Sequence, residues 1–90
     1  MKQTAVVILN WNGQKHLAHY MPSVVGNTPA DVRIVVADNG STDDSVEFLK
    51  ANYPSVEILQ LDKKYGFAEG YNRALREIKA EYYVLLNSDV

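Results

Sequence analysis

The hydrophobic residues of this chain gather in four short runs, and the segments between them have helical spacing. The runs cover residues 4–9, 33–37, 56–61 and 82–86. Three of them are nearly continuous and rich in β-branched or aromatic side chains, which is typical of strands covered on both faces. The run 56–61 alternates in part between apolar and polar residues, so we expect that strand to be less covered on one face.

Three helices are predicted between these strands. The first has an apolar stripe at positions i, i+3, i+4 and i+7, formed by Leu17, Tyr20, Met21 and Val24. Pro22 lies inside this segment and lacks a backbone donor, so a kink or a late helix start is expected. The second helix is expected over residues 41–53, where short polar side chains suit a helix start, and the third over residues 68–80. The inward stripe of the third helix consists of Tyr71, Ala74, Leu75 and Ile78.

The strands and helices alternate in the order β-α-β-α-β-α-β. Such alternation predicts an α/β fold of three layers, α/β/α, with a mainly parallel sheet and right-handed crossovers. We expect one small domain over residues 1–90. Ligands of open parallel sheets bind beyond the carboxyl ends of the strands. That rule selects four loops, which cover residues 10–13, 38–43, 62–70 and 87–90.

The composition excludes several classes of protein. The chain is 47% hydrophobic and 22% charged, as in a folded domain, and its net charge of −2 offers no footprint for nucleic acid. No apolar run approaches the roughly 20 residues that cross a bilayer, and no cysteine is present. We expect a cytoplasmic protein; for a longer parent chain, a peripheral position on the cytoplasmic face of the membrane stays open. His16 and His19 are expected on the surface, because no carboxylate at helical spacing completes a metal site.

The first loop has a structural and a functional interpretation. Trp11 can pack on the neighbouring helix, or it can present a flat face on which a base stacks. Asn10 and Asn12 can cap the helix that follows. From this loop alone the structural interpretation is favoured.

The second loop leaves the two interpretations even. Gly40 is expected to allow a sharp turn with positive φ. Asp38 and Asn39 can hydrogen-bond the imide edge of a pyrimidine base or ribose hydroxyls. A helix cap with a turn is the alternative, but it does not explain why an acid stands at the strand end, where it loses solvent.

The third and fourth loops offer groups that suit a diphosphate and a metal ion. The third combines glycines with Lys63, Lys64 and Arg73, and such a loop before a helix can hold a diphosphate through N–H groups and cations. Solvated lysines over a glycine turn are the slightly favoured alternative. Asp89 follows the last strand and can bind Mg²⁺ or Mn²⁺ together with diphosphate oxygens, or can be a plain polar strand end.

Taken together, the loops resemble those of the family 2 glycosyltransferases with a GT-A fold. The matching segments are VILNWNG at 7–13, VVADNGSTD at 35–43, GFAEGYNRA at 66–74 and YVLLNSD at 83–89. In that family these residues form only the N-terminal, nucleotide-binding half. The resemblance implies transfer of a sugar from a UDP-, dTDP- or GDP-sugar donor to a carbohydrate or lipid-linked acceptor, in polysaccharide or glycoconjugate synthesis.

The resemblance also implies roles for single residues. The implied donor-nucleotide contacts are Leu9, Trp11, Asp38, Asn39, Gly66, Asn72, Arg73 and Asn87. Among these, Leu9 and Trp11 match the base pocket, and Asp38 and Asn39 match an acidic pair that reads the pyrimidine. Asp89 matches the metal position of a D-x-D motif, and the implied cofactor is Mg²⁺ or Mn²⁺, which neutralises the leaving diphosphate.

Two positions depart from the family pattern. Asn39 stands where a second Asp is usual, and Asn87 replaces the first Asp of D-x-D. Because Asn87 brings no charge to a metal, metal dependence is implied less strongly. Both substitutions look like a subgroup associated with deoxysugar transfer, such as rhamnosyltransferases that use a dTDP donor.

No residue of the chain suits the general base that would deprotonate the acceptor, and we expect that base beyond Val90. The chain is therefore expected to be the donor-binding part of a longer enzyme, without the acceptor-binding half, and to transfer no sugar alone. An uncovered strand edge or apolar face is expected to drive homo-oligomer formation. Two alternatives stay open: a non-catalytic, self-associating module with a vestigial site, and a sugar nucleotidylyltransferase. The second class requires a Gly-rich basic loop after the first strand, and residues 10–13 offer one glycine and no adjacent Arg.

Overall fold

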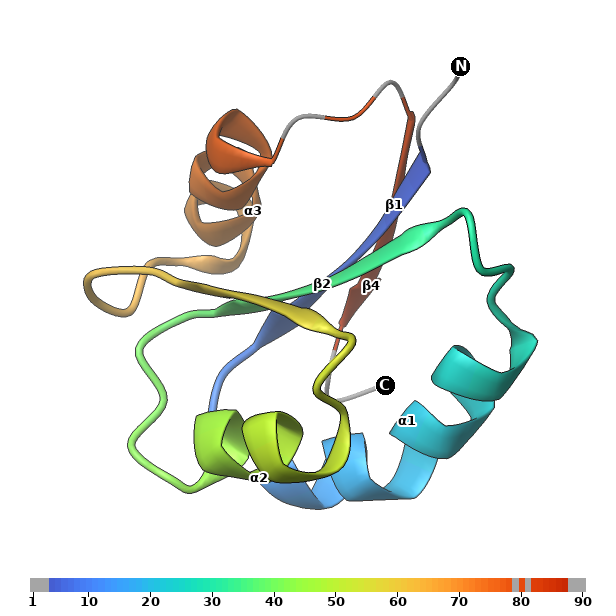
Figure 1. Ribbon diagram of the computed structural model, residues 1–90. Helices are drawn as coiled ribbons and strands as arrows, with labels where there is room; N and C mark the ends of the chain where they lie inside the picture. The colour runs from blue at the N-terminus through green and yellow to red at the C-terminus, as the bar shows by residue number, and fades with distance from the viewer. Residues whose placement is uncertain (1–3, 79, 81, 88–90) are drawn as a thin grey trace.

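The computed structural model describes residues 4–78, 80 and 82–87 of the ninety-residue chain. Strands and helices alternate in the predicted order (Figure 1). The strands are β1 (Thr4–Asn10), β2 (Arg33–Asp38), β3 (Glu57–Gln60) and β4 (Tyr82–Asn87). The helices are α1 (Gln14–Asn27), α2 (Ser45–Asn52) and α3 (Phe67–Glu77). None of the helices in these described ranges is long and apolar enough to cross a membrane.

The four strands form one parallel sheet in the order β3-β2-β1-β4. The chain moves outward from β1 through β2 to β3 and then returns to the other side of β1. The direction of winding therefore reverses between β1 and β4. In open α/β sheets the crevice at the carboxyl ends of two such strands is the usual ligand site.

The sheet is covered by helices on both faces, as the three-layer prediction requires. In Figure 1, α3 lies on one side of the sheet, and α1 and α2 lie on the other. Ala5, Val7 and Leu9 of β1 point toward the α3 side, and Val6 and Ile8 point to the α1 and α2 side. This alternation follows from the two-residue period of a strand and explains why β1 reads as a continuous apolar run.

Helix α1 starts earlier than one of the expected alternatives. It begins at Gln14 and continues through Pro22, so the late start is wrong. Figure 1 shows α1 bending along its length, as expected for a helix that lacks one backbone donor. Leu17 and Met21 of the predicted stripe are fully buried.

Helix α3 also has the predicted inward stripe. Tyr71, Ala74 and Ile78 are buried, and Leu75 is partly buried against the same cluster. The helix is shorter than expected at its carboxyl end, since it ends at Glu77. Its first residue is Phe67, one residue before the predicted start.

Strand β4 is the main correction to the sequence-based picture. Its apolar run predicts a strand covered on both faces, yet its side chains from Tyr82 to Leu86 are 37 to 51% exposed. β4 is an outer strand of the sheet and pairs with β1 alone among the described strands. The predicted uncovered strand edge is therefore present, and it lies at β4.

Candidate functional site

The first three loops selected by the strand-end rule converge at one edge of the sheet. Asn10 and Asp38 are partners in the parallel register of β1 and β2, so the loops after both strands start side by side. Leu9 and Asn87 are partners in the register of β1 and β4. The crevice where the winding reverses therefore lies directly beside the loop that contains Trp11.

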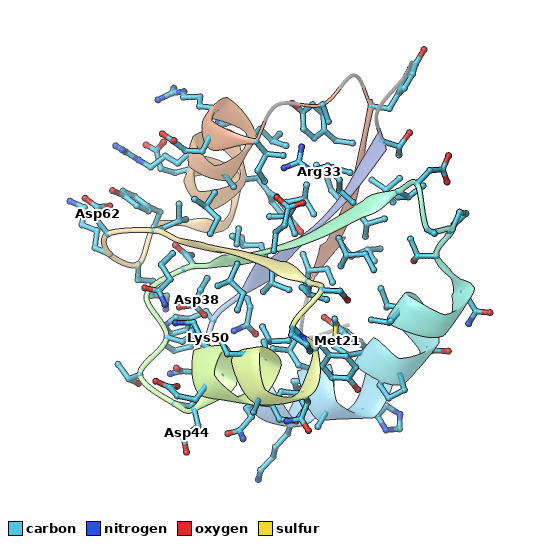
Figure 2. All side chains as sticks on the ribbon, in the orientation of Figure 1. Met21, Arg33, Asp38, Asp44, Lys50 and Asp62 are labelled. Atoms are coloured by element: carbon cyan, nitrogen blue, oxygen red, sulfur yellow. The ribbon has the colours of Figure 1, made fainter. Side chains whose placement is uncertain are left out.

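Asp38 is a buried carboxylate with three hydrogen-bond donors. It is only 5% exposed. Its Oδ1 accepts bonds from Asn10 Nδ2 at 3.0 Å and Ser41 Oγ at 2.7 Å, and its Oδ2 accepts one from the Ser41 N–H at 3.0 Å. Figure 2 shows Asp38 inside the fold, whereas Asp44 and Asp62 lie at its periphery. These donors explain how an acid is tolerated at the end of a buried strand, which is the point that the sequence left open.

Asn10, at the end of β1, links the first loop to the second through its buried side chain. Its Nδ2 donates to Asp38 and, at 3.3 Å, to Ser41 Oγ. Its side chain is fully buried, and its Oδ1 has no hydrogen-bond partner among the described residues. A buried carbonyl oxygen without a donor is uncommon and costs stability.

Asn12 is a second link, and it corrects the prediction that it caps the next helix. Its Oδ1 accepts bonds from the N–H groups of Thr42 at 2.7 Å and Asp43 at 3.2 Å, and its own N–H donates to Ser41 Oγ at 2.9 Å. Its φ of 49° lies in the left-handed region, which an asparagine tolerates better than most residues. Asn12 therefore binds the second loop to the first instead of capping α1.

Asp43 supplies the helix caps that Asn10 and Asn12 do not. Its Oδ2 accepts from the N–H of Gln14, the first residue of α1, at 3.2 Å. Its Oδ1 accepts from the N–H of Ser45, the first residue of α2, at 3.0 Å, and from Ser45 Oγ at 2.5 Å. Partial burial favours the protonated acid, but the bonds from Ser45 and Gln14 outweigh it and hold the pKa of Asp43 below its usual value.

Asn39 clamps the third loop onto the second. Its Nδ2 donates to the carbonyl oxygen of Tyr65 at 2.8 Å, and its Oδ1 accepts from the N–H of Tyr65 at 2.9 Å. The residue is 3% exposed. Its amide is thus used by backbone groups, which makes Asn39 a residue that positions the third loop.

Gly40 brings the backbones of these two loops into contact. Its φ is 77°, as the sequence predicts for a sharp turn. A Cβ atom at this position would lie 2.8 Å from the Lys64 nitrogen and 3.0 Å from the Lys63 carbonyl carbon. Backbone atoms cannot give way cheaply, so the approach requires glycine.

Trp11 is exposed and is covered by a cation. The residue is 45% exposed, so it is only partly packed against the rest of the fold and leaves room for the functional interpretation. Lys64 of the third loop places its Nζ 3.5 Å from the centroid of the indole ring. A flat aromatic face at the crevice is what the functional interpretation requires.

Leu9 lies deeper than Trp11. It is 5% exposed and belongs to the core cluster under α3. A Cβ atom on Gly70 would lie 3.3 Å from both of its methyl carbons and 3.4 Å from Asn39 Nδ2. Leu9 therefore sets the depth at which the start of α3 packs, and Gly70 allows that close approach.

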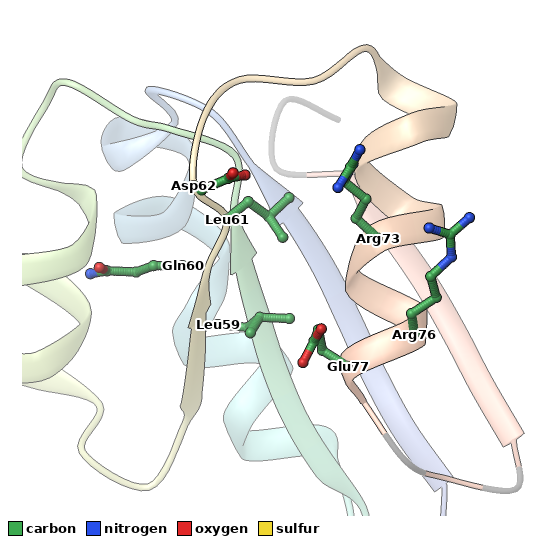
Figure 3. A pocket seen from close by; sticks show the side chains of 7 residues that line it. All are labelled: Leu59, Gln60, Leu61, Asp62, Arg73, Arg76 and Glu77. Atoms are coloured by element: carbon green, nitrogen blue, oxygen red, sulfur yellow. The ribbon is translucent and has the colours of Figure 1, made fainter.

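Arg73 of α3 contacts the third loop at Tyr65. Its guanidinium carbon lies 4.2 Å from the centroid of the Tyr65 ring, and its Nε lies 3.6 Å from Glu69 Oε2. Arg73 also lines a hollow of about 370 Å³ between β3 and α3 (Figure 3). Tyr65 donates its phenolic proton to Asp62, which lowers the pKa of Asp62 and raises that of Tyr65.

The remaining predicted site residues are brought together only in part. Gly66 precedes α3, and a Cβ atom there would meet nothing within 4 Å. Asn72 is exposed on α3. Asn87 ends β4, while Asp89 and its proposed metal contact lie outside the described residues. His16 and His19 are exposed on α1, as expected.

Within the described ranges, 4–78, 80 and 82–87, no group of three or more His, Cys, Asp or Glu side chains could hold a metal ion. The side chains of the first two loops are used mainly for hydrogen bonds to each other.

The sequence profile of "Glycosyl transferase family 2" matches residues 5–90, which is nearly the whole chain. The chain belongs to glycosyl transferase family 2. This membership confirms the resemblance noted from the four loop segments. It also favours a glycosyltransferase over the nucleotidylyltransferase and the non-catalytic module.

The chain is also similar to individual enzymes of named activity. Chondroitin synthase of Escherichia coli is 30% identical over 94% of this chain and 13% of its own length. N-acetylglucosaminyl-diphospho-decaprenol L-rhamnosyltransferase of Mycobacterium tuberculosis is 29% identical over 81% of this chain and 24% of its own length. The chain spans 13 to 29% of the length of the curated relatives it matches.

Solved structures confirm the fold. Staphylococcus aureus TarS 1-349 in complex with UDP-GlcNAc has a TM-score of 0.81 at 23% identity, over 99% of this chain and 27% of that chain. The Pyrobaculum calidifontis mannosyltransferase PcManGT, in complex with GDP-Man and Mn²⁺, has a TM-score of 0.79 at 22% identity, over 96% of this chain and 27% of that chain.

Proposed function

We propose that this chain is the donor-binding part of a glycosyltransferase that uses a nucleotide-diphosphate sugar. The acceptor would be a carbohydrate or a lipid-linked carbohydrate, and the acceptor site and general base would lie in further residues of a longer enzyme. Family membership supports the reaction class. The relatives are several times longer than this chain, so they have further residues in which an acceptor site and a general base could lie.

The observation that carries the proposal is that Asp38 and Trp11 come from neighbouring strand ends: Asp38 ends β2, and Trp11 directly follows Asn10, its register partner at the end of β1. Three donors fix the Asp38 carboxylate, so about one of its roughly four acceptor positions stays open. A base that stacks on Trp11 could donate its imide N–H to that open position of the Asp38 carboxylate.

The structure changes the role proposed for Asn39. The family resemblance puts it beside the base, but both ends of its amide bond the Tyr65 backbone. We therefore assign base recognition to Asp38 and Trp11, and the placement of the third loop to Asn39. Leu9 would act in the same indirect way, through its contact with the start of α3.

A divalent cation is part of the proposal and rests on Asp89. Mn²⁺ is present in the complex of the related mannosyltransferase structure. When bound, such an ion neutralises charge on the leaving diphosphate. Asn87 has no charge to offer, so Asp89 would be the one carboxylate ligand from the D-x-D segment.

The relatives do not decide the donor base and sugar of this chain, because they differ in the nucleotide and the sugar that they use. One solved relative holds UDP-GlcNAc, another holds GDP-Man, and one curated relative is a rhamnosyltransferase. The two asparagines at positions 39 and 87 favour a deoxysugar donor such as a dTDP-sugar. This choice stays a prediction.

The test is a thermal-shift series with UDP, dTDP and GDP, each with and without Mn²⁺. A nucleotide at 100 times its Kd stabilises a protein by about 2.7 kcal/mol, which for a domain of this size raises Tm by roughly ten degrees or more. We expect stabilisation by one base above the others, a larger effect with Mn²⁺, and loss of the Mn²⁺ effect in Asp89→Ala.

Pyrophosphate with Mn²⁺ is the control, because it has the phosphates and the metal without a base. If pyrophosphate stabilises as well as any nucleotide, the base pocket at Trp11 is wrong. If no nucleotide raises Tm at all, donor binding by this chain is wrong.

A further inference from the structure

Lys64 occupies the position that a stacked base would need. Its Nζ lies 3.5 Å from the centroid of the Trp11 ring. Atoms in van der Waals contact are about 3.5–4.0 Å apart, so an ammonium group at this height leaves no room for a base on the same face. Lys64 and a stacked base therefore exclude each other on this face.

The covered face of Trp11 is turned toward the third loop, which carries Lys64. Lys64 belongs to the third loop, whose backbone lies against the second loop at Gly40. The same second loop starts at Asp38, the proposed partner of the base. We place the base on this covered face, because the loop that starts at Asp38 meets the third loop at the backbone of Lys64.

Only the side chain of Lys64 is free to leave. The backbone of Tyr65, the next residue, is fixed by two hydrogen bonds to the Asn39 side chain. The backbone nitrogen of Lys64 is held against Gly40. The four-carbon stem of a lysine has rotatable bonds and can move the ammonium group without moving the loop.

We infer that Lys64 has two positions: over Trp11 when the site is free, and on the diphosphate when a nucleotide is bound. This inference rests on the proposed nucleotide-binding function. A nucleoside has to displace the ammonium group and has no phosphate to which that group can bind. A nucleoside diphosphate displaces it as well, but offers two phosphates to which the same cation can donate hydrogen bonds.

The consequence is selection for the diphosphate form of the ligand. Free nucleosides compete with the ammonium group for Trp11, so their binding is weakened by the cation–π energy. An exposed cation–π contact corresponds to about a two- to five-fold change in affinity. Diphosphates regain this loss through the new contact with Lys64.

The experiment uses Lys64→Ala and compares each nucleoside with its diphosphate: uridine with UDP, thymidine with dTDP, and guanosine with GDP. Trp11 is the single tryptophan of the chain, so its fluorescence reports binding directly. For the preferred base, Lys64→Ala should tighten nucleoside binding about two- to five-fold. The advantage of the diphosphate over the nucleoside should fall by roughly five- to ten-fold.

Lys63→Ala is the matched control, because this substitution removes the same charge from the same loop. The Nζ atom of Lys63 lies 5.6 Å from the centroid of the Tyr65 ring and not over Trp11. It should leave nucleoside binding unchanged. Lys64→Arg keeps a cation that can cover the ring, and it should preserve the advantage of the diphosphate.

A ligand-free measurement separates this inference from the proposed function. Lys64→Ala should make Trp11 more accessible to acrylamide quenching, and Lys63→Ala should not. If quenching is unchanged in Lys64→Ala, or if nucleoside and diphosphate affinities fall together, the two-position role is wrong even when nucleotides bind. If quenching changes as expected but no nucleotide binds to any variant, the proposed function is wrong and the inference falls with it.

Discussion

The sequence leaves the role of Asn39 open between a ligand contact and a structural contact, and the structure supports the structural contact. As a replacement for an aspartate, Asn39 suggests a ligand contact. In the fold it donates to one backbone group of Tyr65 and accepts from the other. A carboxylate can accept but cannot donate, so an aspartate could make only one of these two bonds.

This difference leads to a prediction for Asn39→Asp. The variant should lose about 1–3 kcal/mol of unfolding free energy, because a buried carbonyl loses its donor and faces a negative oxygen. Urea denaturation at neutral pH measures the change. Asn27→Asp is the control, because Asn27 Nδ2 also donates to a backbone carbonyl, at 2.8 Å, but in an exposed position. Equal losses in the two variants would contradict the clamp.

At the scale of elements, the first two helices share one cap. Asp43 accepts from the first N–H of α1 and the first N–H of α2. Helix starts carry partial positive charge, so an ionised carboxylate stabilises both at once. The loop between β2 and α2 thereby fixes where α1 begins, and with it the position of Trp11.

The lowered pKa of Asp43 predicts a dependence of stability on pH. Its folded-state pKa lies below that of an ordinary aspartate, so its contribution is complete above the ordinary value and is lost as pH falls through the folded-state value. Asp43→Ala should lose about 0.5–2 kcal/mol at neutral pH, the usual cost of a lost cap. The difference from the unaltered chain should shrink as the solution is acidified.

Urea midpoints measured across the acidic range check this prediction. Asp44→Ala is the control, because Asp44 is exposed and its side chain makes no cap bond to α2 in the described structure. A loss in Asp43→Ala that stays constant down to strongly acidic pH would show that the carboxylate charge does not contribute.

Strand β4 carries a second prediction at this scale. Its exposed apolar side chains lie on an outer strand of the sheet, and such edges pair readily with other chains. We expect the ninety-residue chain to self-associate with increasing concentration, as measured by light scattering or sedimentation. Leu85→Lys should shift the chain toward the monomer, whereas Ala51→Lys, which adds the same charge to the exposed face of α2, should not. A monomer at high concentration in the unaltered chain would contradict this prediction.

At the scale of the whole molecule, local patterns were enough to predict the fold. The type and order of all the elements follow from strand runs and helical stripes, and the three layers follow from their alternation. The strand-end rule also predicts the edge of the sheet that carries the site, whereas the strand order that places the crevice between β1 and β4 was not predicted. Family membership agrees with the loop segments from which the resemblance was drawn.

The details of the site could not be predicted, because they depend on partners far apart in the chain. Asn39 and Tyr65 are separated by 26 residues, Asn10 and Asp38 by 28, and Asp43 and Gln14 by 29. No local pattern shows which asparagine reaches which loop. The same reason explains the early prediction that α2 starts near residue 41: the polar side chains there bond the first loop, and the helix starts at Ser45.

The exposure of β4 could not be predicted for a different reason. A continuous apolar run predicts burial, but it does not show which element supplies the cover. In the described structure β1 receives helices on both sides, while β4 keeps both faces of its run partly open. The pattern was therefore right about strand formation and wrong about the environment of the strand.

The central claim is that a nucleoside diphosphate binds at the carboxyl edge of the sheet, with its base on Trp11 and near Asp38. A heteronuclear NMR titration of the ninety-residue chain with the best nucleotide tests it most directly. The account predicts that the Trp11 indole N–H signal and the backbone signals of residues 38–41 and 63–66 shift together with one Kd. Signals at the opposite edge, around residues 29–33 and 55–57, should stay in place. Shifts confined to that opposite edge, or a Trp11 signal that does not move at saturation, would contradict the account.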